Sequence, residues 1–276
     1  MTFQGYYTII FDFCIQLKEA WRKTGEKETW RYGFVLNELG NASQCLGQYE
    51  QAIDFHQKSL EIKKKIGDCN GEVDSLGNLG NCYNSLGEYP RAINYYDQSL
   101  LIAKEINDYN GESNSLNNLG NSYTSLKDYS NAIDHYEQSL LIKMELGERN
   151  GESNCLNNLG VVYRILGQHQ QAIKYFQRSL QIQSELDERK MGERRVEANT
   201  WFNLGLALEN VNRESDALGA YRNARELYQA MGLDADAQKC DRAIDRLSQP
   251  QVPTTPRRGF WQWLSRLWRW LKRLWQ

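Results

Sequence analysis

The stretch NLGNCYNSLGEYPRAINYY at residues 78–96 returns 40 residues later as NLGNSYTSLKDYSNAIDHY at residues 118–136. Its Leu-Gly dipeptide is spaced by 40 residues along the chain, except that the last spacing is 45. A repeat of this length and regularity indicates stacked supersecondary units. The dipeptides are Leu39-Gly40, Leu79-Gly80, Leu119-Gly120, Leu159-Gly160 and Leu204-Gly205.

Small, apolar and aromatic residues recur at fixed sequence offsets from each of these five glycines. Alanine stands 12 residues after the glycine, an aliphatic residue 13 after it, a ring 16 after it, and apolar residues 22 and 26 after it. Steps of three, four and six positions keep one stripe of a helix facing inward, so the pattern predicts an all-α protein. The alanines are Ala52, Ala92, Ala132, Ala172 and Ala217, and the rings are His56, Tyr96, Tyr136, Phe176 and Tyr221.

Within one unit, turn-forming residues separate two predicted helices. In the third unit the first helix is expected over residues 111–126, the turn at Lys127 and Asp128, and the second helix over residues 129–147. In the second unit Pro90 suits the first turn of a helix, because an N–H group is not needed there. Each unit is therefore predicted to be a helix-turn-helix.

The glycine of each Leu-Gly dipeptide falls inside the first predicted helix. Glycine costs about 1 kcal/mol there relative to alanine, so a neighbouring helix is expected to approach too closely for a side chain. We expect the recurring alanine to be its counterpart on that helix. The five additional residues of the fourth unit fall between Lys190 and Arg195, which predicts a loop insertion.

Composition agrees with an elongated array. The 276 residues are 41% hydrophobic and 25% charged, enough to bury a core shared between neighbouring units. Six cysteines without a Cys-x-x-Cys pair are expected to be buried reduced thiols, which indicates a reducing, cytoplasmic location. The apolar run from Tyr6 to Leu17 lacks a basic leader and a cleavage site, so it reads as the second helix of an incomplete repeat.

The pattern Asn-Leu-Gly-Asn-x-Tyr-x-x-Leu-Gly-x-Tyr-x-x-Ala-Ile-x-x-Tyr resembles the tetratricopeptide repeat. The 40-residue period resembles its long-helix variant, the Leu-Gly-Asn type, which is also found in many bacterial arrays. The end units depart most, with Ser43 in place of tyrosine in the first and Leu206 and Leu208 in the fifth. The resemblance implies a right-handed superhelix, or α-solenoid, whose first helices line a concave groove for peptides or protein surfaces.

This resemblance and the positions of the turn-forming residues divide the chain into segments. We expect a degenerate half repeat, five repeats, a capping helix, a proline-containing linker and a basic tail. Their bounds are residues 1–30 for the half repeat, 31–70, 71–110, 111–150, 151–195 and 196–235 for the repeats, 236–248 for the cap, 249–256 for the linker and 257–276 for the tail.

In the family, the positions three before, one after and four after the glycine face the groove. Here these positions carry mostly amides, with Gly77 and Val161 as interruptions. A ladder of asparagines is expected to pair with both the C=O and the N–H groups of an extended peptide backbone. The predicted peptide-binding residues are Asn37, Asn41, Gln44, Asn81, Asn84, Asn117, Asn121, Thr124, Asn157 and Arg164.

The alternative expectation for these amides is a structural role within the fold. The asparagine after the glycine belongs to the general repeat consensus, and Asn78, Asn118, Asn158 and Asn203 are expected to make inter-helix hydrogen bonds. The clamp that some family members use for a terminal carboxylate needs several basic groove residues. Only Arg164 is basic here, so that mode of recognition is disfavoured.

The last 20 residues form a strongly amphipathic sequence. They hold five of the eight tryptophans, six of the 33 basic residues and none of the 35 acidic residues, so the rest of the chain carries a net charge of −8. On a helical projection Phe260, Trp263, Leu264, Leu267, Trp268, Leu271, Leu274 and Trp275 share one face, Trp261 and Trp270 border it, and the basic residues are Arg257, Arg258, Arg266, Arg269, Lys272 and Arg273.

A helix of this kind is typical of a membrane interface. Over 17 residues it would be about 25 Å long, too short and too charged to cross about 30 Å of hydrocarbon. We expect it to lie on an anionic membrane, where each basic residue contributes about 1 kcal/mol. Docking on the acidic array, oligomerisation and binding to a partner are the alternatives, whereas nucleic acid is disfavoured because the acidic body repels a polyanion.

No residue pattern supports an enzyme. The three histidines, His56, His135 and His169, occupy aromatic or outward positions, and no phosphate loop, metal-ligand spacing or nucleophile motif occurs. We therefore expect no catalytic residue, cofactor, metal or small-molecule substrate. The sequence predicts an interaction adaptor that binds a protein or peptide and is tethered to the inner face of a membrane. The alternatives are a receptor for a signalling peptide and a carrier of a membrane-active tail.

Overall fold

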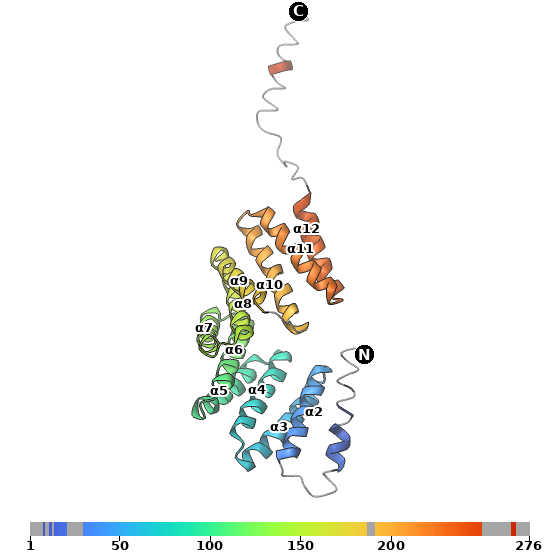
Figure 1. Cartoon of the computed structure of the whole chain (residues 1–276), viewed down its shortest axis with the longest axis vertical. Helices are drawn as coiled ribbons and strands as arrows, with labels where there is room; N and C mark the ends of the chain where they lie inside the picture. Colours follow the sequence, from blue (N-terminus) through green and yellow to red (C-terminus); the bar gives the residue numbers. More distant parts are fainter. Residues whose placement is uncertain are drawn as a thin grey trace, which may run out of the picture.

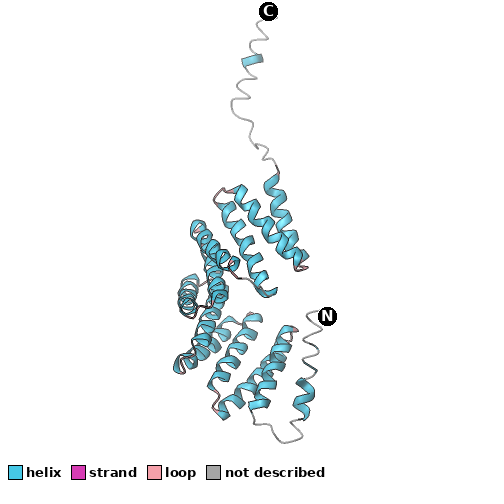
Figure 2. Cartoon of the chain, viewed as in Figure 1, coloured by secondary structure: helices cyan, strands magenta, loops and turns pink. Residues whose placement is uncertain are grey.

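The computed structural model describes Thr8 and residues 11–12, 14–20, 30–186, 191–249 and 266–268, and within these residues the chain is helical without strands (Figures 1 and 2). The helices are α2 (Trp30–Cys45), α3 (Tyr49–Ile66), α4 (Cys69–Ser85), α5 (Tyr89–Glu105), α6 (Tyr109–Ser125), α7 (Tyr129–Glu145), α8 (Arg149–Ile165), α9 (His169–Ser184), α10 (Met191–Asn210), α11 (Glu214–Ala230) and α12 (Asp234–Ser248).

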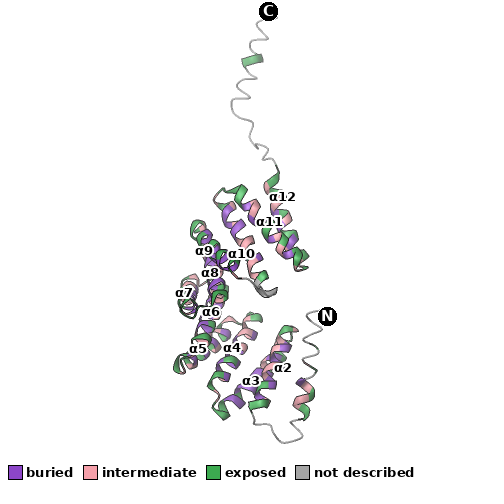
Figure 3. Ribbon diagram, in the orientation of Figure 1, coloured by how far each residue is buried: buried purple, intermediate pink, exposed green. Residues whose placement is uncertain are grey.

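The helices stack in chain order into an arc, so the protein is an α-solenoid. Each helix packs mainly against its two neighbours in sequence, and α2, α4, α6, α8 and α10 also contact one another directly. Figure 1 shows these first helices on the inner side of the arc and α3, α5, α7 and α9 on the outer side. The buried residues follow the seams between adjacent helices, as Figure 3 shows, because a solenoid divides its core among neighbouring units.

Local chemistry fixes the helix ends close to the predicted bounds. Helix α6 begins two residues before its expected start, because the side chain of Asp108 accepts a hydrogen bond from the Gly111 N–H at 3.0 Å. Helix α7 begins at Tyr129 as predicted and ends two residues earlier than predicted. Pro90 lies in the first turn of α5, as expected.

The prediction of a loop insertion between Lys190 and Arg195 is wrong for most of its length. Residues from Met191 onward belong to α10, which has 20 residues where the other first helices have 16 or 17. Arginine and glutamate are good helix formers, and they extend the first turn of the helix instead of opening a loop.

The close approach predicted at the Leu-Gly glycines is confirmed, but its counterpart is the ring and not the alanine. A Cβ atom at Gly120 would stand 2.6 Å from Tyr136 Cε1, and one at Gly160 would stand 2.6 Å from Phe176 Cε1. His56, Tyr96 and Tyr221 cover the other three glycines in the same way. The alanines are fully buried elsewhere in the same seams. In each repeat, therefore, a ring of the second helix packs directly against the backbone of the first helix at the glycine.

Buried serines join the helices and were not anticipated from the sequence. Ser99 on α5 donates to the Val73 carbonyl on α4 at 3.0 Å, and Ser115 on α6 donates to Ser99 Oγ at 3.0 Å. The same pattern recurs with Ser59 on Gly33, Ser139 on Ser113 and Ser179 on Ser153. A satisfied buried hydroxyl at the same position of the first four repeats favours a single register between their helices.

The ends of the chain are described only in part. Cys14 is buried against Val35, Leu36 and Phe55, so the N-terminal helical residues pack onto α2 and α3. The structure describes Thr8, residues 11–12, 14–20 and Trp30 of the predicted half repeat, Gln249 of the linker, and Arg266–Trp268 of the tail, which are helical and exposed. The rest of these three segments lies outside the described residues. Among the helices that the structure describes, none is both long and apolar enough to cross a membrane.

The six cysteines are free, and four of them are buried as predicted. Cys45 and Cys69 are exposed, which corrects the expectation for these two positions. They lie at the end of α2 and the start of α4, where the chain enters and leaves a turn. Burial raises the pKa of the Cys82 thiol to about 12 and that of Cys240 to about 11, so neither thiol forms a reactive thiolate at neutral pH.

Candidate binding groove

The structure places all ten predicted peptide-binding residues on the first helices α2, α4, α6 and α8. Each of the ten side chains is half-buried, neither in the core nor fully in solvent. They stand on the side where the first helices contact one another, so they form one continuous surface on the inside of the arc. We call this surface the groove.

The side-chain carbonyl oxygens of the groove amides are used by the fold itself. Tyr96 Oη donates to Asn81 Oδ1 at 2.7 Å, and Tyr136 Oη donates to Asn121 Oδ1 at 2.7 Å. Asn37 and Asn41 accept from Asn78, Asn117 accepts from Asn158, Asn84 accepts from Ser122, and Asn157 accepts from Thr200, at 3.1–3.2 Å. The structural role expected for the amides is therefore real.

The expected inter-helix asparagines behave in two ways. Asn78 and Asn158 each donate to the preceding repeat, as predicted. Asn118 and Asn203 make no such hydrogen bond within the described part of the chain. At Asn118 the preceding repeat holds Gly77 in place of the asparagine to which Asn78 and Asn158 donate. The prediction is thus confirmed at two of the four positions.

What remains for a ligand is mainly hydrogen-bond donors. The Nδ2 groups of Asn81, Asn84, Asn117, Asn121 and Asn157 have no acceptor among the residues that the structure describes. Asn41 Nδ2 donates to Glu38 Oε1 at 3.1 Å. The side-chain oxygens of these asparagines already accept hydrogen bonds within the fold, so free donors outnumber free acceptors at these positions. The groove presents N–H groups, which suit carbonyl oxygens and anions.

Two predicted residues differ from the amides. The Thr124 hydroxyl turns back to its own helix, where it donates to the Gly120 carbonyl at 2.8 Å. Arg164 has a buried Nε atom without a hydrogen-bond partner in the structure as described, and burial lowers the pKa of its guanidinium. Arg164 therefore brings an unpaired cation to the C-terminal half of the groove.

In the second, third and fourth repeats, a stacked pair of rings that was not predicted from the sequence joins the first helix to the second. Tyr83 stacks on Tyr95, Tyr123 on His135 and Tyr163 on Tyr175, each with ring centroids 5.3 Å apart and nearly parallel planes. The signal in the sequence is a ring three residues after the glycine and another fifteen residues after it. These pairs fix each first helix against its second helix and so position the groove side chains.

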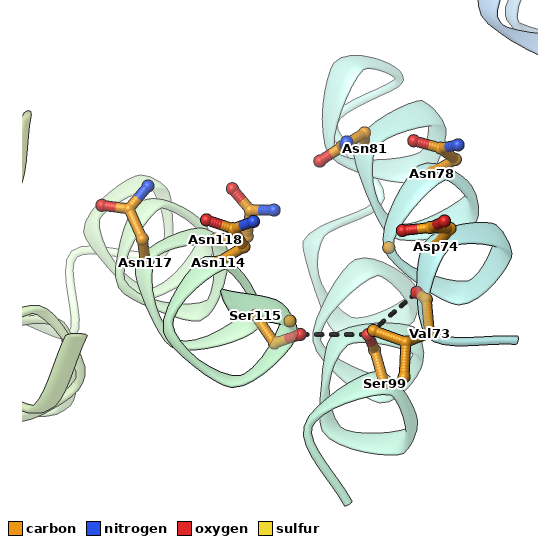
Figure 4. Close-up of a pocket in the computed structure, with 11 residues that line it drawn as sticks. Val73, Asp74, Asn78, Asn81, Ser99, Asn114, Ser115, Asn117 and Asn118 are labelled. Atoms are coloured by element: carbon orange, nitrogen blue, oxygen red, sulfur yellow. Dashed lines mark hydrogen bonds between the residues drawn. The ribbon is translucent and has the colours of Figure 1, made fainter. Parts of the chain in front are cut away.

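The N-terminal half of the groove contains two cavities. The one between α4 and α6 has a volume of about 240 Å³ and is lined by Asp74, Gly77, Asn78, Asn114, Asn117 and Asn118, among others (Figure 4). The other has a volume of about 530 Å³ and is lined on α2 and α4 by Glu38, Asn41, Gln44, Asn78 and Asn81, among others. A carboxylate lines each of them, Asp74 in the first and Glu38 in the second.

Comparisons with solved structures find the same fold at low sequence identity. BtubC (BKLC) from P. vanneervenii superposes with a TM-score of 0.67 at 19% identity, covering 83% of this chain and 91% of that one. The apo form of the quorum sensor NprR from B. thuringiensis has a TM-score of 0.68 at 15% identity, covering 91% and 73%. The Rap conjugation gene regulator of the plasmid pLS20, in complex with the Phr* peptide, has a TM-score of 0.64 at 15% identity, covering 80% and 60%.

No curated protein matches the sequence. The family model described as "Tetratricopeptide repeat" matches residues 31–105 and 111–185, which together make up more than half of the chain. Such repeats typically form interaction scaffolds, and the helix pairs, the seated rings and the concave amide surface agree with that architecture. The chain belongs to the tetratricopeptide repeat family.

Proposed function

We propose that this protein is a non-enzymatic scaffold that binds an extended peptide or protein segment in its groove. The observation that carries the proposal is the row of half-buried amide Nδ2 groups on successive first helices, held in place by hydrogen bonds to their own oxygens. Similarity in fold to a Rap regulator solved with the Phr* peptide supports the proposal. In the same proposal the repeats are of the Leu-Gly-Asn type and wind as a right-handed superhelix.

Fixed donors suit a peptide backbone better than a particular side chain. Every residue of an extended segment offers a carbonyl oxygen, so a row of N–H groups can hold many sequences. The donors are preorganised, because Tyr96 and Tyr136 already orient Asn81 and Asn121 before any ligand arrives. Preorganisation lowers the entropy cost of binding.

The test removes the amide N–H donors but keeps the side-chain oxygens that the fold uses. In a variant with Asn81→Asp, Asn84→Asp and Asn121→Asp, each side chain keeps an oxygen for its tyrosine or serine but loses its N–H groups. We expect capture of peptides from a displayed random library to fall at least tenfold, with thermal unfolding close to wild type. A control with Gln57→Glu, Gln138→Glu and Gln177→Glu adds the same charge on the outer helices, at exposed positions. Equal capture by all three proteins would contradict the proposal.

We further propose that residues 257–276 tether the scaffold to an anionic membrane from the cytoplasmic side as an amphipathic helix. Support comes from the composition of the tail, with six basic residues, five tryptophans and no acid. The test is co-sedimentation of the full chain and of a chain ending at Pro256 with anionic and neutral vesicles, at low and high salt. Binding that needs the tail and anionic lipid is the expected result. No binding by either form would reject the tether and favour docking of the tail on the array.

A further inference from the structure

At Gly77 the ladder of groove amides lacks a side chain altogether. The position three before the Leu-Gly glycine holds Asn37, Asn117 and Asn157 in the other groove repeats. A Cβ atom built on Gly77 would meet nothing within 4 Å. The missing side chain therefore leaves open space between α4 and α6, and the cavity of about 240 Å³ lies at this point. A water molecule needs only about 10–15 Å³ measured with a water-sized probe, so the cavity can hold a long side chain.

The gap leaves neighbouring polar groups without the partners that they have elsewhere. At the equivalent positions one repeat further on, Asn158 donates to Asn117 Oδ1 at 3.1 Å and Cys155 lies 3.8 Å from the same oxygen. Asn118 and Ser115 lack the asparagine that the other groove repeats hold at the position of Gly77, and within the described residues Ser115 keeps only its hydrogen bond to Ser99. Figure 4 shows Asn114, Asn117 and Asn118 of α6 on the same side as Asp74, Asn78 and Asn81 of α4.

Asp74 gives the cavity its charge. The equivalent residue is Asn114, Asn154 or Asn199 in the following repeats, so the carboxylate is particular to this one. Asp74 makes no ion pair or hydrogen bond with any other residue that the structure describes. Lys63 is the nearby cation, but it is buried and its Nζ donates to the Gly71 carbonyl at 2.9 Å.

The field around Asp74 is net acidic. Desolvation raises the pKa of the Asp74 carboxyl, Lys63 opposes this effect, and the carboxylates of Asp108 and Asp68 add to it. Both of those carboxylates are fixed in place as helix N-caps, where they accept from Gly111 and Gly71. A cation in the cavity would meet the carboxylate of Asp74, and more acidic than basic groups act on that carboxylate from nearby, so the site favours positive charge.

We propose that the cavity at Gly77 is a specificity pocket that takes an arginine side chain of the ligand, an inference that rests on the proposed function of the groove. A guanidinium group carries five N–H donors in a plane, and it matches a carboxylate flanked by amide oxygens. Asp74 supplies the charge, and Asn114 and Asn118 supply oxygens that no other described residue engages. The amides elsewhere in the groove hold the backbone, and this pocket selects the sequence.

The test uses substitutions that the other repeats already contain. Gly77→Asn fills the gap with the residue found at the three equivalent positions, and Asp74→Asn removes the charge with the residue found in the following repeats. Both variants are expected to fold as well as wild type, checked by thermal unfolding. Asp134→Asn, an exposed change on α7, is the control for loss of one negative charge.

The probe is a displayed random peptide library selected on the full chain, followed by synthesis of the selected peptides with the arginine replaced by citrulline, its uncharged isostere. We expect wild type and the control to select arginine at one position, and both pocket variants to bind peptides without that preference. Citrulline should weaken binding to wild type about tenfold and leave binding to Asp74→Asn unchanged.

Peptides captured by wild type without an arginine preference, or an equal loss with citrulline in wild type and Asp74→Asn, would overturn the pocket while leaving the scaffold intact. No capture of any peptide by wild type would reject the scaffold and the pocket together.

Discussion

The hydroxyl of Tyr96 donates to Asn81 Oδ1 at 2.7 Å, and across the second, third and fourth repeats the two positions change together. Tyr136 and Asn121 repeat the pair at 2.7 Å, whereas Phe176 and Val161 occupy the same two positions in the fourth repeat with no polar group on either side. In the fifth repeat, where Leu206 follows the glycine, Tyr221 donates to Glu209 at 3.0 Å instead. In the second and third repeats the asparagine after the glycine is thus the partner of the ring that covers the glycine. This coupling holds the amide nitrogen of Asn81 and of Asn121 toward the groove.

The pairing predicts a coupled effect in the fourth repeat. Phe176→Tyr alone should destabilise the protein by about 1–3 kcal/mol, because its buried hydroxyl would face Val161 where the two preceding repeats hold an asparagine. Adding Val161→Asn should recover most of that loss, as in the two preceding repeats. Urea unfolding of the single and double variants gives the coupling free energy. Additive effects of the two changes would show that the pairs are independent.

His56 makes folding sensitive to mild acid. It is fully buried on Gly40, neither ring nitrogen has a partner within the described residues, and burial, with a smaller contribution from Lys63, lowers its pKa from 6.5 to about 4. Above pH 6.5 the imidazole is neutral in both the folded and unfolded states. As the pH falls toward 4, only the unfolded state takes up the proton, so stability is lost by up to about 3 kcal/mol.

The variant His56→Phe, which copies Phe176 of the fourth repeat, should remove that dependence. The measurement is the free energy of unfolding of both proteins at pH 7 and pH 5. A wild-type protein that loses no more stability than the variant would mean that His56 is not held neutral in the fold.

Much of the fold follows from spacing, because a helix period and a fixed repeat specify which residues share a face. The glycines and the rings 16 residues later were identified in this way, whereas the groove positions came from the resemblance to the tetratricopeptide repeat. Partner choice did not follow, since alanine and ring both recur and only the packing shows that Tyr136 covers Gly120. The orientation of the groove amides did not follow either, because it depends on hydroxyl and amide partners from other helices. The gap at Gly77 is visible in the sequence, but the cavity depends on how α6 lies beside α4.

Lys127 adopts a backbone conformation that suits glycine. Its φ is 63°, and the equivalent turn residues Gly47, Gly87 and Gly167 have φ between 76° and 78°. A side chain in this left-handed region costs about 1 kcal/mol, so Lys127→Gly should stabilise the protein by about that amount or somewhat less. Thermal unfolding measures the change. An unchanged or lower midpoint would indicate that the lysine side chain makes a compensating contact.

Two glycines in the middle of neighbouring first helices should respond in opposite ways to the same substitution. At Gly120 a Cβ atom would stand 2.6 Å from the Tyr136 ring, which is buried and hydrogen-bonded to Asn121, so Gly120→Ala must displace the ring. We expect a loss of about 1–3 kcal/mol, as for an overpacked core. At Gly77 the same Cβ atom meets open space, and Gly77→Ala should stabilise α4 by about 0.5–1 kcal/mol through the helix preference of alanine. Both variants replace glycine by alanine in a helix. The difference between their free energies of unfolding in urea therefore reports the packing of the ring on Gly120, apart from helix propensity. If Gly120→Ala were as stable as Gly77→Ala, the rings would not be seated on the glycines in solution.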